Sequence, residues 1–345
     1  MKLNFECDYN NGTHPLILQK LVQTNNEQSL TYGYDRWSLC AKEKIKAVCG
    51  CKDAEVFFLC AGTQTNSVII DSLLRPTQGV ISTCQSHINV HEAGAIESCG
   101  HKVIVLNNCE EKINAEALDK FMQDFHADES KEHMVQPALV YITQPTELGS
   151  LYSKLEIEQI YNVCRKHSLQ LFIDGARLGY GLASPKCDTD ITHISKNCDV
   201  FYIGGTKNGA LCGEAAVFTH GNMPADFFTL AKRHGAVMSK SRLIGIQFDV
   251  LFSDNLYFKT ARQGIETAMQ IKNIFTQKGF QFFTDSPTNQ QFIILDNKTM
   301  QQLAEKVIFT RWMPYDSSHT VCRFVTSWAT TQQDVNKLKE IIFSL

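Results

Sequence analysis

Several features that would point to a membrane, a nucleic acid or a secretion route are missing from this sequence of 345 residues. No uninterrupted apolar run approaches the ~18 residues that a membrane-spanning helix needs. The 33 basic and 36 acidic side chains leave a net charge of −3, which offers no electrostatic surface to nucleic acid or acidic lipid. Residues 1–6 lack the apolar run of a signal peptide. We therefore expect a cytoplasmic globular protein that binds neither nucleic acid nor membranes.

The sequence also lacks the paired C-x-x-C motifs of structural zinc sites, although it contains 13 cysteines. That number is odd, and Cys49, Cys60, Cys99 and Cys164 lie in apolar segments. Such a distribution is typical of buried, reduced thiols rather than of a disulfide framework. We expect free thiols in a reducing compartment and no metal site.

What the sequence does have is an apolar content of 43%, which is enough to fill a large core. Between residues 55 and 219, short β-rich runs alternate with helical patterns. The runs are continuously apolar, as in strands covered on both faces, so the alternation predicts an α/β fold with a mostly parallel sheet. The expected strands are 55–60, 79–84, 102–106, 138–143, 169–174, 199–203 and 215–218.

The pattern changes in the last third of the chain. The expected elements there are long helices at 226–252 and 256–278 and strands at 291–295, 310–313 and 321–325. A final helix follows, for which Thr330 and Gln333 suggest a capping box. We predict a large domain, residues 1–254, and a smaller α+β domain, residues 255–345, with a cleft between them.

Polar residues gather where the apolar runs end, at the edge where open α/β sheets bind ligands. The first run ends in Cys60-Ala-Gly-Thr-Gln-Thr-Asn66, which begins a helix. Backbone N–H groups of Gly62, Thr63 and Gln64 would form an anion site at that helix N-terminus. An ordinary helix start remains an alternative, because the segment matches neither a dinucleotide fingerprint nor a P-loop.

Two later strand ends carry charged side chains. Asp174 directly follows a buried run, either as a helix cap or as a charge aimed into a site. Lys207 lies in the tight turn Gly205-Thr-Lys-Asn-Gly209, where burial would lower its pKa and make it an imine-forming amine; a solvated loop lysine is the alternative. An anion site, an acid and a lysine in this order match the needs of pyridoxal 5′-phosphate.

A stacking partner for such a ring follows the second strand. The segment Cys84-Gln-Ser-His-Ile-Asn-Val-His-Glu92 offers His87 for that position. His87 and His91 are spaced as zinc ligands on a helix would be, but the segment lacks the H-E-x-x-H pattern.

Taken together, these motifs resemble those of the low-specificity L-threonine aldolases, in the beta-eliminating lyase group of fold-type-I pyridoxal phosphate enzymes. The resemblance covers nearly the whole chain, with eight motifs in the family's order. They are residues 7–15, 32–35, 61–66, 86–92, 143–149, 174–177, 205–209 and 323–327. The resemblance implies the fold of that class and pyridoxal 5′-phosphate as cofactor.

The resemblance also implies a role for each residue of the expected site. Lys207 would form the Schiff base, Asp174 would pair with the pyridine nitrogen, and His87 would stack on the ring. The other implied cofactor contacts are Gly62, Thr63, Gln64, Arg177, Thr206 and, from a neighbouring subunit, Lys240 or Arg242. The other implied substrate contacts are Cys7, Arg177, Arg323 and, from the neighbouring subunit, Tyr32. Shared sites of this kind imply a homodimer or homotetramer.

The implied activity is cleavage of L-threonine, L-allo-threonine or a related β-hydroxy-α-amino acid to glycine and an aldehyde. A base must take the hydroxyl proton, and His87, Glu147 and a water are the candidates. Cys7 stands where many family members have serine, and Glu147 where many have histidine. These two departures leave the preferred small-molecule substrate open.

Other interpretations are open at this point. The same fold supports β-elimination, decarboxylation and transamination, and a non-catalytic relative would serve as a binding protein. Arg323 could be an exposed strand residue, and Tyr32 a turn aromatic. The combined presence of the lysine, the acid, the histidine and both arginines favours an enzyme.

Overall fold

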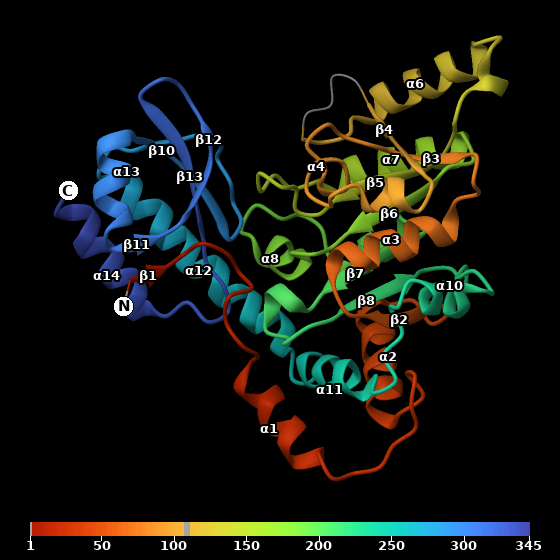
Figure 1. Cartoon of the computed structure of the whole chain (residues 1–345), viewed down its shortest axis with the longest axis horizontal. Helices are drawn as coiled ribbons and strands as arrows, with labels where there is room; N and C mark the ends of the chain where they lie inside the picture. The colour runs from red at the N-terminus through yellow and green to blue at the C-terminus, as the bar shows by residue number, and fades with distance from the viewer. Residues whose placement is uncertain (1, 107–110) are drawn as a thin grey trace.

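The computed structural model describes residues 2–106 and 111–345, which form two lobes joined by a long helix (Figure 1). The larger lobe is built on a seven-stranded sheet in the order β2-β8-β7-β6-β5-β3-β4. Its strands are β2 (Glu55–Leu59), β3 (Gln78–Ser82), β4 (Lys102–Val105), β5 (Gln136–Thr143), β6 (Gln170–Asp174), β7 (Val200–Gly204) and β8 (Glu214–Phe218). Only β8 runs antiparallel to its neighbours in this sheet. The predicted mostly parallel α/β sheet is confirmed.

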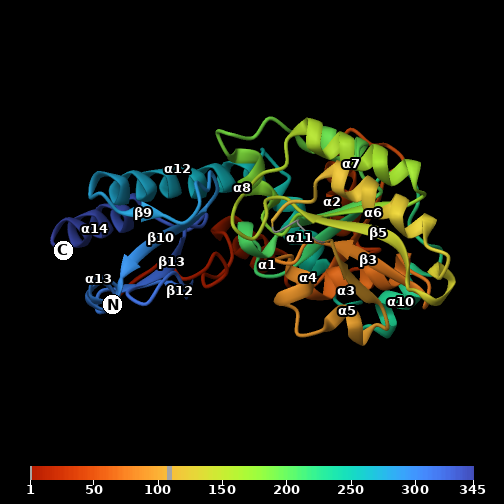
Figure 2. The same ribbon diagram turned by 90° about the horizontal axis from the view of Figure 1, so that it is seen from above.

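Helices cover both faces of the sheet, as Figure 2 shows. One apolar core joins the sheet to α2 (Arg36–Cys49), α6 (Ala115–Ala127), α7 (Lys154–Lys166), α9 (Ile191–Lys196) and α11 (Arg242–Leu251). The other joins it to α3 (Gly62–Leu73), α5 (Ala95–Ser98) and α10 (Phe227–Arg233). Short elements complete this lobe: α1 (Pro15–Thr24), α4 (His87–Val90), α8 (Leu178–Ala183), η1 (Lys131–His133) and η2 (Thr206–Asn208). Two-sided coverage explains why the strands are continuously apolar.

The smaller lobe is an antiparallel sheet in the order β12-β13-β10-β9 with helices on one side. Its elements are α12 (Leu256–Gln277), β9 (Gln281–Phe282), β10 (Gln290–Asp296), α13 (Asn297–Ala304), β11 (Val307–Ile308), β12 (Thr310–Pro314), β13 (His319–Val325) and α14 (Gln332–Phe343). The sequence-based division puts residues 1–254 in the large domain, but β1 (Leu3–Asn4) pairs with β11. The N-terminal strand therefore lies in the smaller lobe (Figure 1).

Three local expectations are wrong. The helix expected over 226–252 is two helices, α10 and α11, because Gly235 adopts a positive φ of 65° just after α10 ends. The residue pattern also predicts a single helix near 90–98, and the structure instead has α4 and α5 there. The capping box of the last helix is formed by Thr331 and Asp334 rather than one residue earlier.

The expectation that Cys49, Cys60, Cys99 and Cys164 are buried is confirmed for two of them. Cys49 and Cys164 are buried, whereas Cys60 and Cys99 are partly exposed. No helix within residues 2–106 and 111–345 is long and apolar enough to cross a bilayer.

The sheet brings several strand ends to one edge of the larger lobe. Leu59 at the end of β2 and Gly204 at the end of β7 both pair with Glu214 at the start of β8. The loops after β6 and β7 cross closely, and the N–H of Gly204 donates to the carbonyl of Gly175 at 2.9 Å. A Cβ on Gly204 would lie 2.2 Å from a backbone oxygen of that loop. This close approach is possible only without a side chain.

Candidate active site

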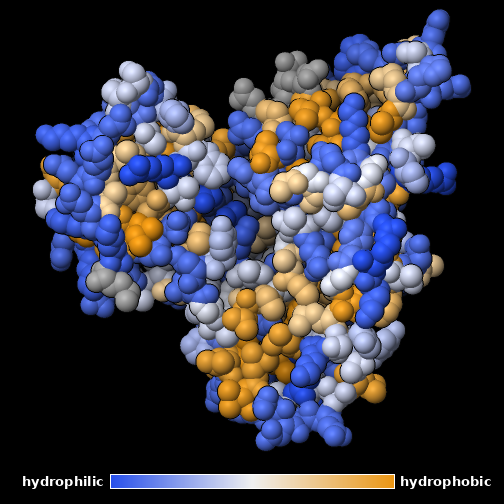
Figure 3. Space-filling model, viewed as in Figure 1, coloured by the Kyte–Doolittle hydropathy of each residue, from blue (hydrophilic) through white to orange (hydrophobic). Residues whose placement is uncertain are grey.

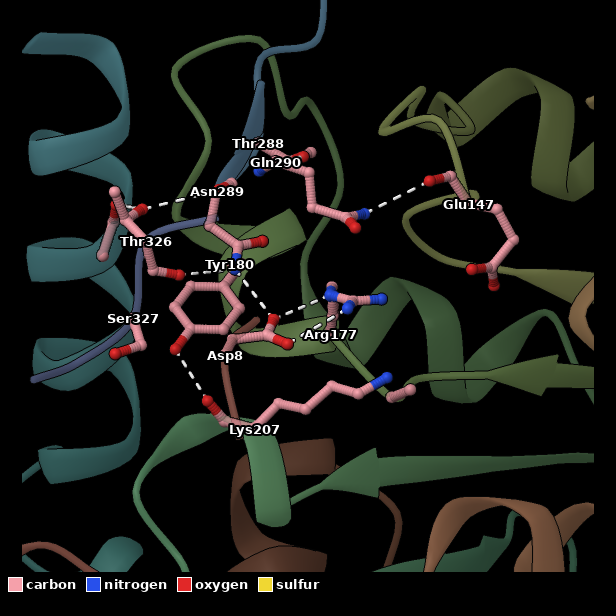
Figure 4. A network of polar contacts seen from close by, with 12 residues as sticks. Asp8, Glu147, Arg177, Tyr180, Lys207, Thr288, Asn289, Gln290, Thr326 and Ser327 are labelled. Carbon is pink, nitrogen blue, oxygen red and sulfur yellow. Dashed lines mark hydrogen bonds and ion pairs between the residues drawn. The ribbon is translucent and has the colours of Figure 1, made fainter. Parts of the chain in front are cut away.

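Lys207 lies in η2, directly after β7, and Figure 4 shows its side chain extending alongside Asp8 and Arg177. The hydroxyl of Tyr180 donates to its carbonyl oxygen at 2.8 Å and so holds the turn. Burial and the nearby positive charge of Arg177 lower the pKa of the Lys207 amine. A lysine in this state is a better nucleophile at neutral pH than a solvated one.

Asp174, the last residue of β6, is buried and held by three donors. The Tyr141 hydroxyl and the Asn66 amide donate to its Oδ2 at 2.5 and 3.0 Å, and the Ala176 N–H donates to its Oδ1 at 2.8 Å. The carboxylate is thus fixed in place at the strand edge. Tyr141 and Asn66 were not among the expected site residues, although both lie in segments that the sequence pattern marks.

His87 begins α4 and contacts a buried carboxylate that the sequence pattern did not single out. Its Nδ1 lies 2.7 Å from Oε1 of Glu92, and the Asn66 amide donates to the same oxygen at 2.7 Å. Burial lowers the pKa of His87, but the hydrogen bond to Glu92 and the charges of Glu147 and Asp174 outweigh this and raise it. The contact with Glu92 therefore opposes loss of the imidazole proton.

Arg177 is buried and forms a two-pronged contact with Asp8 (Figure 4). Its Nε and Nη2 donate to the carboxylate at 2.7 and 3.0 Å, and the Asn289 amide donates to the same carboxylate at 2.9 Å. Burial raises the pKa of Asp8, but the charges of Arg177 and Lys207 outweigh this and lower it. Sequence analysis missed Asp8, whose position in the motif at 7–15 was the available signal.

Arg323 projects from β13, and its guanidinium group lies against the Trp312 ring, 4.7 Å from the ring centre. Its Nη1 and Nη2 donate only to the neutral oxygens of Gln290 and Thr310, at 3.2 and 3.3 Å. Its Nε is buried and has no partner in the described part of the chain. Burial and the charge of Arg177 lower its pKa. A buried guanidinium group without a carboxylate is prepared to receive an anion.

Cys7 and Glu147 lie at the same centre. Burial raises the pKa of the Cys7 thiol, which is close enough to Arg323 for their charges to interact. The Glu147 carboxylate acts on Lys207, and the Gln290 amide donates to the Glu147 backbone oxygen at 3.3 Å (Figure 4). The structure thus brings two lobes together around one group of charged side chains.

The expected anion site lies at the N-terminus of α3. No side chain caps this helix, so the N–H groups of Gly62 and Thr63 have no acceptor among the residues that the structure describes. The Gln64 side chain accepts from the Cys60 N–H at 3.4 Å. The Thr206 hydroxyl donates to Glu214 at 2.7 Å. We call Gly62, Thr63, Gln64 and Thr206 the anion cup.

Comparison with known proteins decides the family of the chain. A family model described as beta-eliminating lyase matches residues 10–306. The chain belongs to the beta-eliminating lyase family. The resemblance that the sequence motifs indicate is therefore confirmed.

Individual relatives of this beta-eliminating lyase carry more specific names. A low specificity L-threonine aldolase of Pseudomonas sp. (strain NCIMB 10558) is 27% identical over 97% of this chain and 95% of its own length. A solved structure of threonine aldolase from Leishmania major has a TM-score of 0.95 and 36% identity, covering 99% of this chain and 98% of the other. Serine palmitoyltransferase of Sphingomonas wittichii, with a TM-score of 0.74 and 15% identity over 99% and 86% of the two chains, shares the fold.

The donor set of this beta-eliminating lyase fits pyridoxal 5′-phosphate. The unfilled N–H groups of the anion cup suit a phosphate, the fixed Asp174 carboxylate suits a pyridinium nitrogen, and Lys207 suits an aldehyde carbon. His87, with its ring held by Glu92, completes the set.

Three expected residues lie outside this group in the single chain. Tyr32 is exposed and contacts Phe228 and Lys232 instead. Arg242 donates to the backbone carbonyls of Thr24 and Glu27. Lys240 is exposed, with no side-chain partner within the described ranges. Of the two candidate bases, Arg242 is thus engaged within its own chain, whereas Lys240 is not engaged by the described residues.

Proposed function

We propose that this beta-eliminating lyase is a pyridoxal 5′-phosphate-dependent aldolase that cleaves L-threonine, L-allo-threonine or related β-hydroxy-α-amino acids to glycine and an aldehyde. The observation that carries the proposal is the buried guanidinium group of Arg323, which has no carboxylate partner among the described residues and whose Nε has no hydrogen bond there. Arg323 and Lys207 both interact with the charges of Arg177 and Asp8, so amine chemistry and a carboxylate-binding group occupy one site. The names of the Pseudomonas and Leishmania relatives support the same activity.

When bound, pyridoxal 5′-phosphate supplies an electron sink for the bonds at the amino-acid Cα. Lys207 offers an amine whose lowered pKa favours the uncharged form. Asp174 would pair with the ring nitrogen of the bound cofactor, and Arg323 would hold the substrate carboxylate and so orient the bonds at Cα. Arg177 has two of its nitrogens committed to Asp8 and offers the remaining one.

The proton of the substrate hydroxyl needs an acceptor. Glu92 contacts Nδ1 of His87 and raises its pKa, and this same contact commits one of the two ring nitrogens. Glu147, which follows the cis Gln144–Pro145 bond by two residues, has no side-chain hydrogen bond to the part of the chain that the structure describes, and its charge acts on both His87 and Lys207. We therefore assign proton removal to Glu147, directly or through a water, and orientation of the hydroxyl to His87.

The test is aldehyde release from L-threonine in the presence of pyridoxal 5′-phosphate, beside D-threonine and L-serine. Acetaldehyde and glycine from L-threonine alone are expected. Borohydride should fix the cofactor to the wild-type chain and not to Lys207→Ala. Cofactor fixation without aldehyde release would assign the protein to another reaction on this fold, and absence of both would leave a binding protein.

A shared site between subunits is part of the same proposal. Leu16, Leu18 and Val22 on α1 are at least half exposed, and Figure 3 shows apolar side chains gathered over this end of the larger lobe. An apolar surface of this kind is typical of an interface. We propose a homodimer or homotetramer, acting in the cytoplasm, in which Tyr32 and Lys240 reach a neighbouring site.

A further inference from the structure

Glu214 is a buried carboxyl group that the proposed reaction does not use. It begins β8, between the last residues of β2 and β7, because Leu59 and Gly204 are its register partners. The chain after Leu59 leads within three residues to the anion cup at Gly62, and the chain after Gly204 leads to Lys207. Glu214 therefore lies at the base of both loops that would hold the cofactor.

Its contacts commit the Thr206 hydroxyl group of the anion cup. Oε2 of Glu214 accepts from the Gly205 N–H at 2.9 Å, and Oε1 accepts from the Thr206 hydroxyl at 2.7 Å. The Thr206 oxygen accepts in turn from the Gly213 N–H at 3.1 Å. While Glu214 is ionised, the only hydroxyl hydrogen of Thr206 points at the carboxylate and cannot be donated to a ligand.

The charges around Glu214 are mixed. Lys207 is the cation that faces it, whereas Asp174, Tyr202, Tyr257 and Cys212 face it from other elements. Burial raises the pKa of Glu214 to about 7, despite the hydrogen bonds from Thr206 and Gly205 and the charge of Lys207. Both protonation states are thus accessible near neutral pH, and a second anion beside this carboxyl favours the neutral state.

We infer that binding of a phosphate group in the anion cup draws a proton from solvent onto Glu214, so that cofactor loading is proton-linked. The new O–H of Glu214 donates to the Thr206 oxygen, and the hydroxyl hydrogen of Thr206 turns to the phosphate. Oε2 still accepts from Gly205, so the turn that carries Lys207 keeps its geometry. The inference rests on the proposed cofactor and not on the reaction that follows.

The probe is 4-deoxypyridoxine 5′-phosphate, which has the phosphate and ring but no aldehyde, so Lys207 cannot bind it covalently. Its dissociation constant is measured from pH 6 to 8.5 for wild type, Glu214→Gln and Glu55→Gln. Glu55 lies at the far end of the same strand pair. Because the ligand's own ionisation is common to all three proteins, only differences between their pH profiles matter.

Between pH 6 and 8.5 the dissociation constant of wild type should rise about tenfold more than that of Glu214→Gln. This is the effect expected if ligand binding raises the pKa of Glu214 by about one unit. Glutamine imitates the protonated carboxyl, since its amide donates to Thr206 while its oxygen accepts from Gly205. Glu55→Gln should follow wild type. Equal profiles in wild type and a folded Glu214→Gln protein, checked by circular dichroism, would overturn the inference.

A measurement on wild type alone covers the case in which Glu214→Gln does not fold. Sulfate stays a dianion across this range, so calorimetry of sulfate binding in two buffers of different ionisation enthalpy counts protons taken up by the protein. We expect uptake at pH 8 and none at pH 5.5; no uptake at either pH contradicts the inference. If neither probe binds, the proposal that the protein uses pyridoxal 5′-phosphate is contradicted as well. If binding is proton-linked but no aldehyde is released, only the proposed aldolase reaction is contradicted.

Discussion

The Nδ1 atom of His87 and the Oε1 atom of Glu92 are 2.7 Å apart, and this contact connects His87 to the Asp174 side of the site. Asn66 completes the connection, because its amide nitrogen contacts both Glu92 and Asp174. The other oxygen of Glu92, Oε2, is buried with no hydrogen-bond partner within the described residues. The charge of Glu92 is therefore directed at His87 and Asn66.

Replacing this carboxylate should change the titration of the histidine. In Glu92→Gln we expect the pKa of His87 to fall, because burial then acts without the main group that opposes it. NMR titration of the apo-protein, with His87 assigned by substitution, measures the change. Glu97→Gln, an exposed site on α5, is the matched control. An unchanged His87 titration in Glu92→Gln would refute this account of its pKa.

The Arg323 side chain should matter for the substrate and not for the cofactor. Arg323→Ala removes a charged contact to the substrate carboxylate, which costs about 1.5–3 kcal/mol, or roughly 10- to 100-fold in kcat/KM. Cofactor absorbance should be retained. Arg311→Ala, on the neighbouring strand and exposed, should behave as wild type. Loss of cofactor from Arg323→Ala would show that the guanidinium group has a different role.

The Glu147 carboxylate should affect the chemical step. Glu147→Gln keeps the shape of the side chain and removes its basicity, so kcat should fall by roughly 10²- to 10⁴-fold with little change in KM. Glu158→Gln on the outer side of α7 serves as the control. If kcat survives in Glu147→Gln, the proton acceptor is His87 or a water that Glu147 does not hold.

The stability of the fold should depend on Glu214 in a defined pH window. Its pKa rises from 4.5 to about 7 on folding, so its contribution to the free energy of unfolding is complete below pH 4.5 and is lost as pH rises to 7. Glutamine does not titrate, so Glu214→Gln should exceed wild type by up to about 3 kcal/mol at pH 8. Denaturant titrations at pH 4.5 and pH 8 measure this. An equal difference at both pH values would mean that Glu214 does not titrate in this range.

Shared sites predict complementation between inactive chains. Tyr32→Ala and Lys207→Ala homo-oligomers should each be inactive, but mixing their unfolded chains equally and refolding should restore about a quarter of wild-type activity. One site of each mixed pair then has both native residues. Absence of any recovered activity from mixed oligomers would assign Tyr32 to its own subunit or to no site.

Much of the site could be predicted because parallel strands end at one edge. Asp174 and Lys207 follow buried apolar runs in chain order, and this alone places them together. Glu92, Asp8 and Glu214 could not be found in this way. Glu92 contacts His87, five residues away, a separation that neither helix nor strand periodicity would bring onto one face. Asp8 contacts Arg177, which is 169 residues away in the sequence.

Glu214 shows a different limit of sequence reasoning. It precedes an apolar run on a strand that runs antiparallel to its neighbours, so its start, and not its end, lies at the ligand-binding edge. A parallel sheet inferred from strand–helix alternation places such a residue at the opposite edge. The helix boundary at Gly235 was missed for a simpler reason, because apolar spacing continues across the break.

The pairing of β1 with β11 has a consequence for synthesis of the chain. The segment that carries Cys7 and Asp8 is synthesised about 300 residues before its strand partner β11, and earlier still than Arg323. The large sheet has all its strands long before this, since β8 ends at Phe218. We expect the growing chain to hold a folded large lobe while its first residues stay unpaired, a long-range closure of the kind that slows folding. The contacts of Cys7 and Asp8 with the smaller lobe are thus assembled after the large sheet.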